Sequence, residues 1–225
     1  MPRESKRSKR ERATEICRRM GELYPGVKSA LTFANPFELV ICVLLSAQTT
    51  DAGVNRVTPE LFARWPDAQS MATADPEEVG EVIHSIGFWR AKSKHCVETA
   101  QMIVSDFGGE VPGTMEELCR LPGVGRKTAN IVLNKAFSVV DGIAVDTHVF
   151  RLATRFGLTR ATTPAAAEKD LLDVIPRELW CNVNEEWIHF GRDVCTARSP
   201  KCAGCPMADI CPSAGQPDRY IKRRK

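Results

Sequence analysis

The sequence predicts an all-α fold, and three features of the 225-residue chain support that prediction. Four segments begin with a helix-capping pattern, in which a polar side chain precedes proline or glutamate: Asn35-Pro36, Asp75-Pro76, Thr114 to Glu117, and Thr163-Pro164. Apolar residues between 81 and 104 recur at spacings of three and four, as a helix face requires. No other segment offers partner strands for a sheet.

The apolar run 39–45 is the most ambiguous segment, because a buried strand would also read as an uninterrupted series of apolar residues. The cap at Asn35 and the lack of partner strands favour a helix instead. A helix that is apolar on every side is expected to lie at the centre of its domain. We therefore expect 39–45 to form a fully buried central helix.

We expect the chain to divide into two helical lobes with a short metal-binding loop near its end. The chain begins in one lobe, enters the second near residue 30 and returns after about residue 150. These boundaries assign 30–150 to one lobe, with a helix-hairpin-helix at about 114–136. They assign 1–29 and 151–225 to the other lobe, with the loop at 195–211. No tandem repeat, low-complexity segment or flexible linker interrupts the chain.

Composition and charge restrict the class of protein only broadly. No stretch approaches the roughly 18 consecutive apolar residues of a membrane helix, and the basic N-terminus lacks the apolar segment of a secretory signal. We therefore expect a cytoplasmic protein. The net charge of +3 does not by itself predict a nucleic-acid partner. Basic residues crowd 3–12 and 222–225, and such blocks are typical of solvated, disordered tails, although they suit a polyanionic partner.

Residues 121–130, LPGVGRKTAN, predict a tight hairpin between two helices. Pro122 ends the first helix, while Gly123 and Gly125 permit a turn that exposes backbone N–H groups. These N–H groups lie at the start of the next helix, which carries partial positive charge and suits a phosphate. Such a corner can grip a DNA backbone without reading bases. The alternative is a glycine-rich corner that only joins two helices, which the whole string disfavours.

Lys127 and Asp146 are the candidate catalytic residues. Lys127 lies in the first helical turn after the hairpin, where the helix field and partial burial would favour an uncharged, nucleophilic amine. The ordinary alternatives for Lys127 are a solvated charge or a phosphate contact. Asp146 can simply cap the helix that follows it, yet a capping carboxylate can also stabilise positive charge on a sugar during glycosidic cleavage. His148 is assigned a structural role.

Four of the nine cysteines gather near the C-terminus with the spacing C-x6-C-x2-C-x5-C. They are Cys195, Cys202, Cys205 and Cys211. Four thiolates in one short segment can enclose a metal centre, and the spacing leaves zinc and an iron–sulfur cluster equally open. Disulfides are disfavoured in a cytosolic chain. A metal that pins this loop would hold Arg198 and Lys201 toward a phosphate backbone.

These elements together resemble the endonuclease III family of helix-hairpin-helix DNA glycosylases over residues 15–212. The resemblance rests on LLSAQTTD at 44–51, LPGVGRKTAN at 121–130, VDTHVFR at 145–151, and the cysteine spacing at 195–211. It implies an all-helical fold of two lobes with a DNA-facing active site in the cleft between them. It also implies that the four cysteines hold a 4Fe–4S cluster.

The resemblance further implies a role for each site residue. Lys127 is expected to be the Schiff-base nucleophile and Asp146 the catalytic carboxylate. Gln48 is expected to enter the space left by a flipped nucleotide. The implied protein is a monomer that removes oxidised pyrimidines from double-stranded DNA and cleaves the strand by β-elimination. Where many members carry a leucine wedge, this chain has Phe88, which can still wedge between bases; the alternative for Phe88 and Trp89 is helix-junction packing.

Other functions stay open at this level. Adenine-mismatch glycosylases share the implied fold and cluster, but they usually lack the hairpin lysine and carry a longer C-terminal domain, so Lys127 and the length of the chain argue against them. Glycosylases for mismatched thymine or pyrimidine dimers are harder to exclude. From other classes, a non-catalytic DNA-binding module explains the hairpin and the cluster. An electron-transfer protein leaves the hairpin and Asp146 unexplained.

Overall fold

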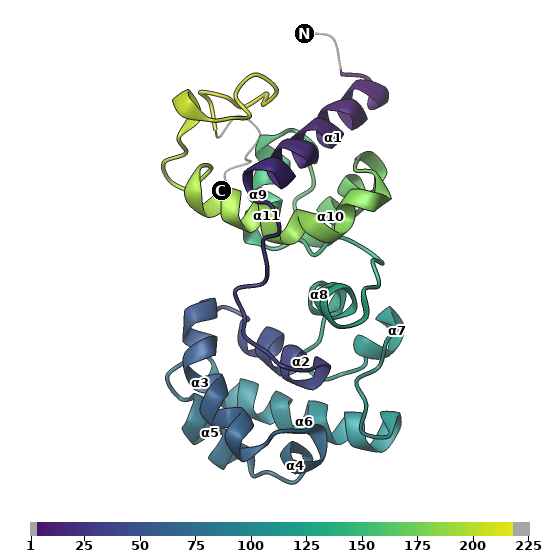
Figure 1. The fold of residues 1–225 in the computed structure, drawn as a ribbon, viewed down its shortest axis with the longest axis vertical. Coiled ribbons are helices and arrows are strands. Elements are labelled where there is room, and N and C mark those ends of the chain that lie inside the picture. Colours follow the sequence, from purple (N-terminus) through teal and green to yellow (C-terminus); the bar gives the residue numbers. More distant parts are fainter. Residues whose placement is uncertain (1–3, 218–225) are drawn as a thin grey trace. The chain divides into compact units, whose positions relative to one another are not determined.

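The computed structural model describes residues 4–217, which form helices joined by loops without any strand (Figure 1). The predicted all-α fold is therefore confirmed. No helix within this part of the chain combines the length and the apolar character that crossing a bilayer would take. The chain divides into two compact units, one containing 29–141 and the other containing 1–28 and 142–225.

The unit formed by 29–141 contains seven helices within the described residues. They are α2 (Pro36–Leu45), α3 (Asp51–Arg64), α4 (Ala68–Ala72), α5 (Pro76–Ile83), α6 (Trp89–Phe107), α7 (Met115–Leu118) and α8 (Arg126–Phe137). The other unit contains four α-helices and two 3-10 turns within the same described range. They are α1 (Lys6–Leu23), α9 (Thr147–Arg155), α10 (Pro164–Val174), η1 (Arg177–Leu179), α11 (Trp180–Asp193) and η2 (Cys202–Gly204).

The second crossing between the units falls at 141–142 rather than near the expected residue 150. Ile143, Val145 and Val149 are buried in the same apolar cluster as α1, α10 and α11. The segment that leads into α9 therefore contributes to the core of the unit that also contains the C-terminal loop. A motif-based boundary misses this, because the apolar residues before Asp146 carry no signal of which core they join.

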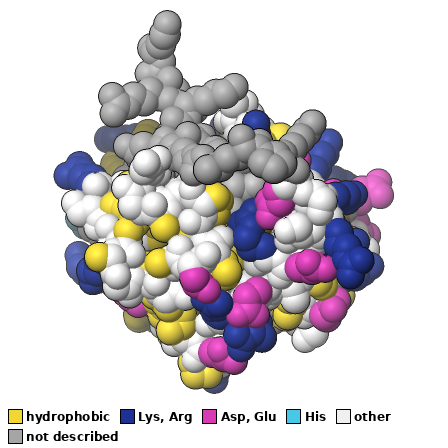
Figure 2. All heavy atoms as spheres, turned by 90° about the horizontal axis from the view of Figure 1, so that it is seen from above, with side chains coloured by type: hydrophobic (Ala, Val, Ile, Leu, Met, Phe, Trp, Pro, Cys, Tyr) yellow, Lys and Arg dark blue, Asp and Glu magenta, His cyan; other side chains and the backbone are white. Residues whose placement is uncertain are grey.

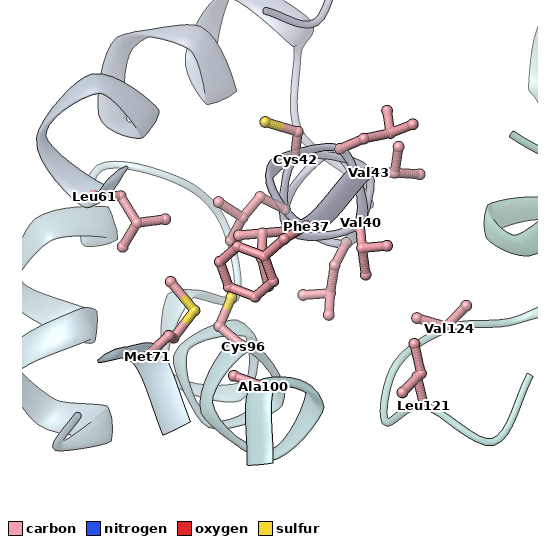
Figure 3. Packing of buried hydrophobic residues seen from close by; sticks show 14 of the residues in the cluster. Phe37, Val40, Cys42, Val43, Leu61, Met71, Cys96, Ala100, Leu121 and Val124 are labelled. Carbon is pink, nitrogen blue, oxygen red and sulfur yellow. The ribbon is translucent and has the colours of Figure 1, made fainter. Parts of the chain in front are cut away.

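Helix α2 is the central helix of its unit, as predicted. The Asn35 side chain accepts a hydrogen bond from the Glu38 N–H at 2.9 Å, and the Glu38 carboxylate accepts one from the Ala34 N–H at 2.6 Å. All residues from 39 to 45 are buried. Figure 3 shows side chains of α3, α4, α6 and the 121–125 hairpin facing α2 from several sides. Because α2 is buried on every side, its sequence is apolar throughout and does not alternate between an apolar and a polar face.

The apolar pattern between 81 and 104 covers two helices rather than one. Helix α5 ends at Ile83 and α6 begins at Trp89. Between them Phe88 has a left-handed backbone, with φ of 59°, which interrupts the helix. Both helices bury their apolar faces in the same core. The spacing of three and four therefore continues across the break, and the sequence alone does not show that there are two helices.

The basic N-terminal segment is helical from Lys6 onward, so the expectation of a disordered tail is wrong for the described part. The Ser5 side chain caps α1 by accepting from the Ser8 N–H at 3.1 Å. Its cations pair with acids of the same unit: Lys6–Asp173 at 2.6 Å, Arg12–Glu4 at 2.8 Å and Arg19–Asp209 at 2.6 Å. Figure 2 likewise shows basic and acidic side chains interspersed on one face. Arg3 and 222–225 lie outside the described residues.

Glu186 is a carboxyl group buried in the core between α1 and α11, only 6% exposed. An added Cβ on Gly21 would lie 3.5 Å from Glu186 Oε1, so this carboxyl group faces α1. Burial raises the pKa of Glu186 from its usual 4.5 to about 7, because the charged form is poorly solvated there. Between pH 4.5 and about 7, Glu186 is therefore protonated in the folded state but ionised in the unfolded chain.

This buried carboxyl group predicts a loss of stability as the pH rises. Neither state is ionised below pH 4.5, so the penalty grows between pH 4.5 and about 7 and then stays constant. Glu186→Gln is expected to stabilise the protein by up to about 3 kcal/mol at alkaline pH and hardly at all in acid. Thermal unfolding across this range checks the prediction, with the exposed Glu178→Gln as control. An unchanged pH profile in Glu186→Gln would contradict it.

Candidate active site

The hairpin between α7 and α8 has the predicted form. Gly123 has φ of 76°, a conformation that residues with a side chain rarely adopt. An added Cβ there would lie 3.0 Å from His95 Nδ1, which leaves no room for one. The Pro122 carbonyl accepts a hydrogen bond from the Thr99 hydroxyl at 2.8 Å, which ties the turn to α6. The turn therefore requires glycine at 123.

Gly125 is different from Gly123. It occupies the N-cap of α8 with an ordinary φ of −94°, and an added Cβ would meet no atom within 4 Å. Neither the backbone conformation nor packing requires glycine here, contrary to the expectation that both glycines shape the turn. The free space in front of Gly125 leaves the first N–H groups of α8 accessible, as a phosphate contact requires.

Lys127 lies in the first turn of α8, and its side chain is exposed. The partial burial that the sequence suggested is absent from the structure. An exposed amine beside the hairpin is sterically open to attack a substrate carbon.

Asp146 is the N-cap of α9, so the capping interpretation is confirmed. Its Oδ1 accepts a hydrogen bond from the Val149 N–H at 2.8 Å, and the residue is half-buried. The preceding backbone is fixed as well, because Asn184 on α11 donates to the Ala144 carbonyl at 2.8 Å. One carboxylate oxygen is thus committed to the cap, and the backbone around Asp146 is held in place. This arrangement orients the carboxylate without excluding a chemical role.

His148 has the structural surroundings that were expected for it. Its Nδ1 lies 3.1 Å from an Arg151 guanidinium nitrogen, and the same nitrogen donates to the Gly191 carbonyl at 2.9 Å. Arg151 also donates to the Cys195 carbonyl at 3.2 Å. The pair therefore joins α9 to the end of α11 and to the start of the cysteine loop.

Gln48 and Phe88 share two unusual properties. Both residues have a left-handed backbone, with φ of 54° and 59°, and both side chains are exposed, Phe88 by 67%. They lie on adjacent loops, because an added Cβ on Gly87 would be 3.8 Å from the Gln48 carbonyl oxygen. A left-handed backbone outside glycine costs on the order of 1 kcal/mol and occurs preferentially at functional sites.

Helix-junction packing describes Trp89 but not Phe88. An added Cβ on Gly80 would lie 2.7 Å from the Trp89 ring, so this ring packs against α5. Phe88 is an exposed aromatic side chain at the start of α6. Its structural alternative is therefore wrong, and its role as a wedge stays a prediction.

The four C-terminal cysteines line one hollow in their unit. Burial and the neighbouring thiols raise the pKa of both Cys205 and Cys211. Four thiolates brought together in such a place therefore need positive charge close by.

Arg155 on α9 supplies positive charge at this hollow. Its buried guanidinium donates to Cys195 Sγ at 3.3 Å and to the Thr196 carbonyl at 2.7 Å. Arg155 and Ser213 both line the hollow. Their buried Nε and Oγ atoms have no hydrogen-bond partner among the described residues. A buried cation and orphaned donors beside four thiols fit an anionic iron–sulfur cluster. Arg155 was not predicted from the sequence, because nothing around it in the sequence distinguishes it from an ordinary helical arginine.

Arg198 and Lys201 are exposed on the loop between the first two cysteines. Arg155 also donates to the Ala197 carbonyl at 2.9 Å, and the Lys201 N–H donates to the Val194 carbonyl at 3.0 Å. Both ends of the loop are therefore fixed to the same unit. The site residues are distributed between the units: Gln48, Phe88, Gly123, Gly125 and Lys127 in 29–141, and Asp146, Arg198, Lys201 and the four cysteines in the other.

Comparison with known proteins identifies the family. Residues 41–177 match the HhH-GPD superfamily base excision DNA repair protein, and 195–211 match the iron-sulfur binding domain of endonuclease III. The chain is 50% identical to endonuclease III of Synechocystis sp., over 92% of this chain and 94% of that protein. The chain belongs to the endonuclease III family. Endonuclease III of Escherichia coli is 40% identical over 88% of this chain and 93% of that protein.

Solved endonuclease III structures agree with this assignment. A non-covalent endonuclease III–DNA complex matches with a TM-score of 0.87 and 39% identity, over 92% of this chain and 97% of that chain. A trapped endonuclease III–DNA covalent intermediate matches with a TM-score of 0.86 and 38% identity, over 98% and 100%. A thermostable thymine-DNA glycosylase at 21% identity shares the fold.

Family membership decides two questions that the sequence pattern left open. The chain is a DNA glycosylase and abasic-site lyase of base excision repair, rather than a non-catalytic DNA-binding module. Its cofactor is a 4Fe–4S cluster rather than zinc. The predicted family, fold, enzymatic activity and cofactor are therefore confirmed.

Proposed function

We propose that the chain removes oxidised pyrimidines from damaged double-stranded DNA and cleaves the strand through a Schiff base on Lys127. The observation that carries this proposal is the position of Lys127, an exposed amine in the first turn of α8, directly after the hairpin. The hairpin suits a DNA backbone, so it brings the amine close to a deoxyribose. We also propose that the protein acts as a cytoplasmic monomer, associated with the cell's DNA.

The proposed reaction begins when the Lys127 amine attacks C1′ of the sugar and the damaged base leaves with the bonding electrons. The amine then loses one proton, the bond between C1′ and the ring oxygen breaks as that oxygen takes up a proton, and an iminium ion forms between the nitrogen and C1′. The iminium withdraws electrons and makes a 2′ proton acidic. Removal of that proton expels the 3′ phosphate, which breaks the strand on the 3′ side. The Asp146 carboxylate stabilises the positive charge that develops on the sugar as the base departs.

Gln48 and Phe88 are proposed to occupy the duplex where the damaged nucleotide has been flipped out. Their exposed side chains on adjacent loops support this role, since a gap in the base stack needs a filling group and a wedge. The N–H groups beside Gly123 and Gly125 are proposed to contact the backbone. Arg198 and Lys201, exposed on the cysteine loop, contribute further phosphate contacts.

The four cysteines that line the hollow are proposed as the cluster ligands. When bound, the cluster supplies four iron–thiolate bonds that hold the ends of the 195–211 loop together. Arg155 compensates the negative charge of the thiolates and fixes the first part of the loop through the Thr196 and Ala197 carbonyls.

The role of Arg155 gives a direct prediction. Arg155→Met replaces the guanidinium by a shorter, unbranched apolar side chain and leaves the thiolate charge uncompensated. This variant is therefore expected to lose its iron several times faster than the wild type when exposed to a chelator. Iron content and visible absorption of the cluster over time check this. Arg192→Met, an exposed arginine on α11, is the matched control. Equal iron retention in Arg155→Met and the control would contradict the assignment.

The proposed substrate class is tested with a panel of damaged duplexes. Fastest excision is expected on thymine glycol, with a covalent adduct on borohydride reduction. Faster excision of an adenine, a mismatched thymine or a pyrimidine dimer would replace the proposed substrate by that lesion. Sedimentation at the assay concentration checks the proposed monomer, expected near 24.9 kDa.

A further inference from the structure

Lys92 on α6 is a buried cation that takes no part in the proposed chemistry. The residue is 5% exposed, and its Nζ donates to the Thr49 hydroxyl at 2.7 Å. Burial lowers the pKa of its amine, because the charged form is poorly solvated. A neutral hydroxyl offsets only part of the cost of burying an ammonium group. An apolar side chain of similar length would fill this space at lower cost, so core stability does not explain a lysine here.

The contacts of Lys92 connect Gln48 and Phe88, two of the exposed residues with a left-handed backbone. Its side chain holds Thr49, the neighbour of Gln48 in the loop between α2 and α3. Its backbone N–H donates to the Phe88 carbonyl at 3.1 Å, in the first turn of α6. The same residue thus contacts both loops. Strained conformations of this kind persist only where surrounding contacts over-determine them, and Lys92 supplies such contacts.

We propose that Lys92 is a positioning residue that fixes the loop bearing Gln48 against the helix start bearing Phe88, so that both side chains enter the duplex together. This inference rests on the roles proposed above for Gln48 and Phe88. Lys92 touches no reacting atom. It acts through Thr49, and its loss leaves Lys127 chemically intact but allows the Gln48 loop to move. Because the flipped state is then poorly supported, the damaged nucleotide spends less time outside the stack.

The test combines two variants that remove the same bond from opposite sides. Lys92→Met and Thr49→Val are each expected to lower kcat/KM for excision about 10-fold, as loss of a charge-assisted hydrogen bond implies. The double variant is expected to be no worse than either single one, because the bond can be lost only once. Thr49→Ser keeps the hydroxyl and should restore wild-type rates. Lys94→Met, an exposed lysine two positions along α6, is the matched control.

Two further measurements separate positioning from a general loss of structure. The melting temperature of Lys92→Met should equal or exceed that of the wild type, since methionine removes a buried charge. Fluorescence of 2-aminopurine placed opposite the lesion reports whether the gap is filled, and it should change in Lys92→Met as it does in Gln48→Ala. Borohydride trapping at saturating enzyme should still reach its wild-type end point, because Lys127 is intact. If Lys92→Met does not fold, Thr49→Val carries the test alone.

The outcomes distinguish this inference from the function on which it rests. Slow excision in Gln48→Ala together with normal excision in Lys92→Met and Thr49→Val would overturn the role of Lys92 alone. Normal excision in Gln48→Ala would overturn the role proposed for Gln48, and the role of Lys92 with it. Additive losses in the Lys92→Met/Thr49→Val double variant would also overturn it, because the two residues would then act independently.

Discussion

Replacement of Lys127 by alanine is expected to abolish the covalent adduct formed with abasic DNA and to reduce strand cleavage about 10³-fold or more. The reason is chemical: the proposed mechanism needs a primary amine at C1′, and alanine removes it while leaving α8 and the hairpin in place. Lys127 is exposed and packs in no core, so the variant should fold as the wild type does. Gel analysis of borohydride-treated reactions measures the adduct.

Lys127→Arg separates chemistry from charge. Arginine keeps the positive charge and any phosphate contact, but its guanidinium is always protonated and is not a nucleophile at neutral pH. Because the charge is kept, Lys127→Arg is expected to bind abasic DNA within about threefold of the wild type. It is expected to form no adduct. Lys94→Ala, which also removes an exposed lysine, is expected to form the adduct normally. An adduct of normal yield in Lys127→Arg would show that another amine is the nucleophile.

Asp146→Asn is expected to lower the rate of base excision about 10²-fold to 10³-fold without destabilising the protein, because it removes only the carboxylate charge. Asparagine caps a helix as well as aspartate does, so the hydrogen bond from the Val149 N–H persists. Asp146→Ala removes both the charge and the cap, and should also lower the melting temperature. Single-turnover excision rates and thermal unfolding of the two variants measure the two effects separately.

The same pair of variants identifies a purely structural role. If Asp146→Asn excises the base at the wild-type rate while Asp146→Ala is slow and unstable, Asp146 serves only as the cap of α9. The half-buried position of Asp146 and the fixed backbone before it make the pair easy to interpret, because neither substitution adds volume to the site.

Local signals in the sequence were sufficient to predict the hairpin and the starts of several helices, α2, α5, α7 and α10. The cap at Asn35 identified α2, and the glycine at 123 identified a turn that does require it. Local signals failed where a backbone conformation interrupts a continuous pattern, as at Phe88, because the apolar spacing of α5 runs on into α6. They also failed at the N-terminus, where the basic composition predicted a disordered tail. This segment is a helix, and its cations pair with acids that are distant in the sequence.

The residues that support the site were invisible to sequence reasoning for a related reason. Arg155 and Lys92 act through partners more than 40 positions away, namely the loop carbonyls near Cys195 and the Thr49 hydroxyl. Each looks like a common helical cation until the fold buries it. A lysine or arginine is expected at the surface by default, so its burial becomes informative only when the structure is known. The exposed residues Gln48 and Phe88 are the converse case, since the structure shows that both have a left-handed backbone and lie on adjacent loops.

The most direct test of the proposed chemistry is to locate the covalent bond within the chain. The borohydride-reduced adduct with an abasic duplex is digested, and its peptides are sequenced by mass spectrometry. The deoxyribose remnant is predicted on the side chain of Lys127, in the peptide that follows the 121–125 hairpin, and it should be absent from Lys127→Arg. A remnant on any other lysine or on the N-terminal amine would contradict the assignment of Lys127 as the nucleophile.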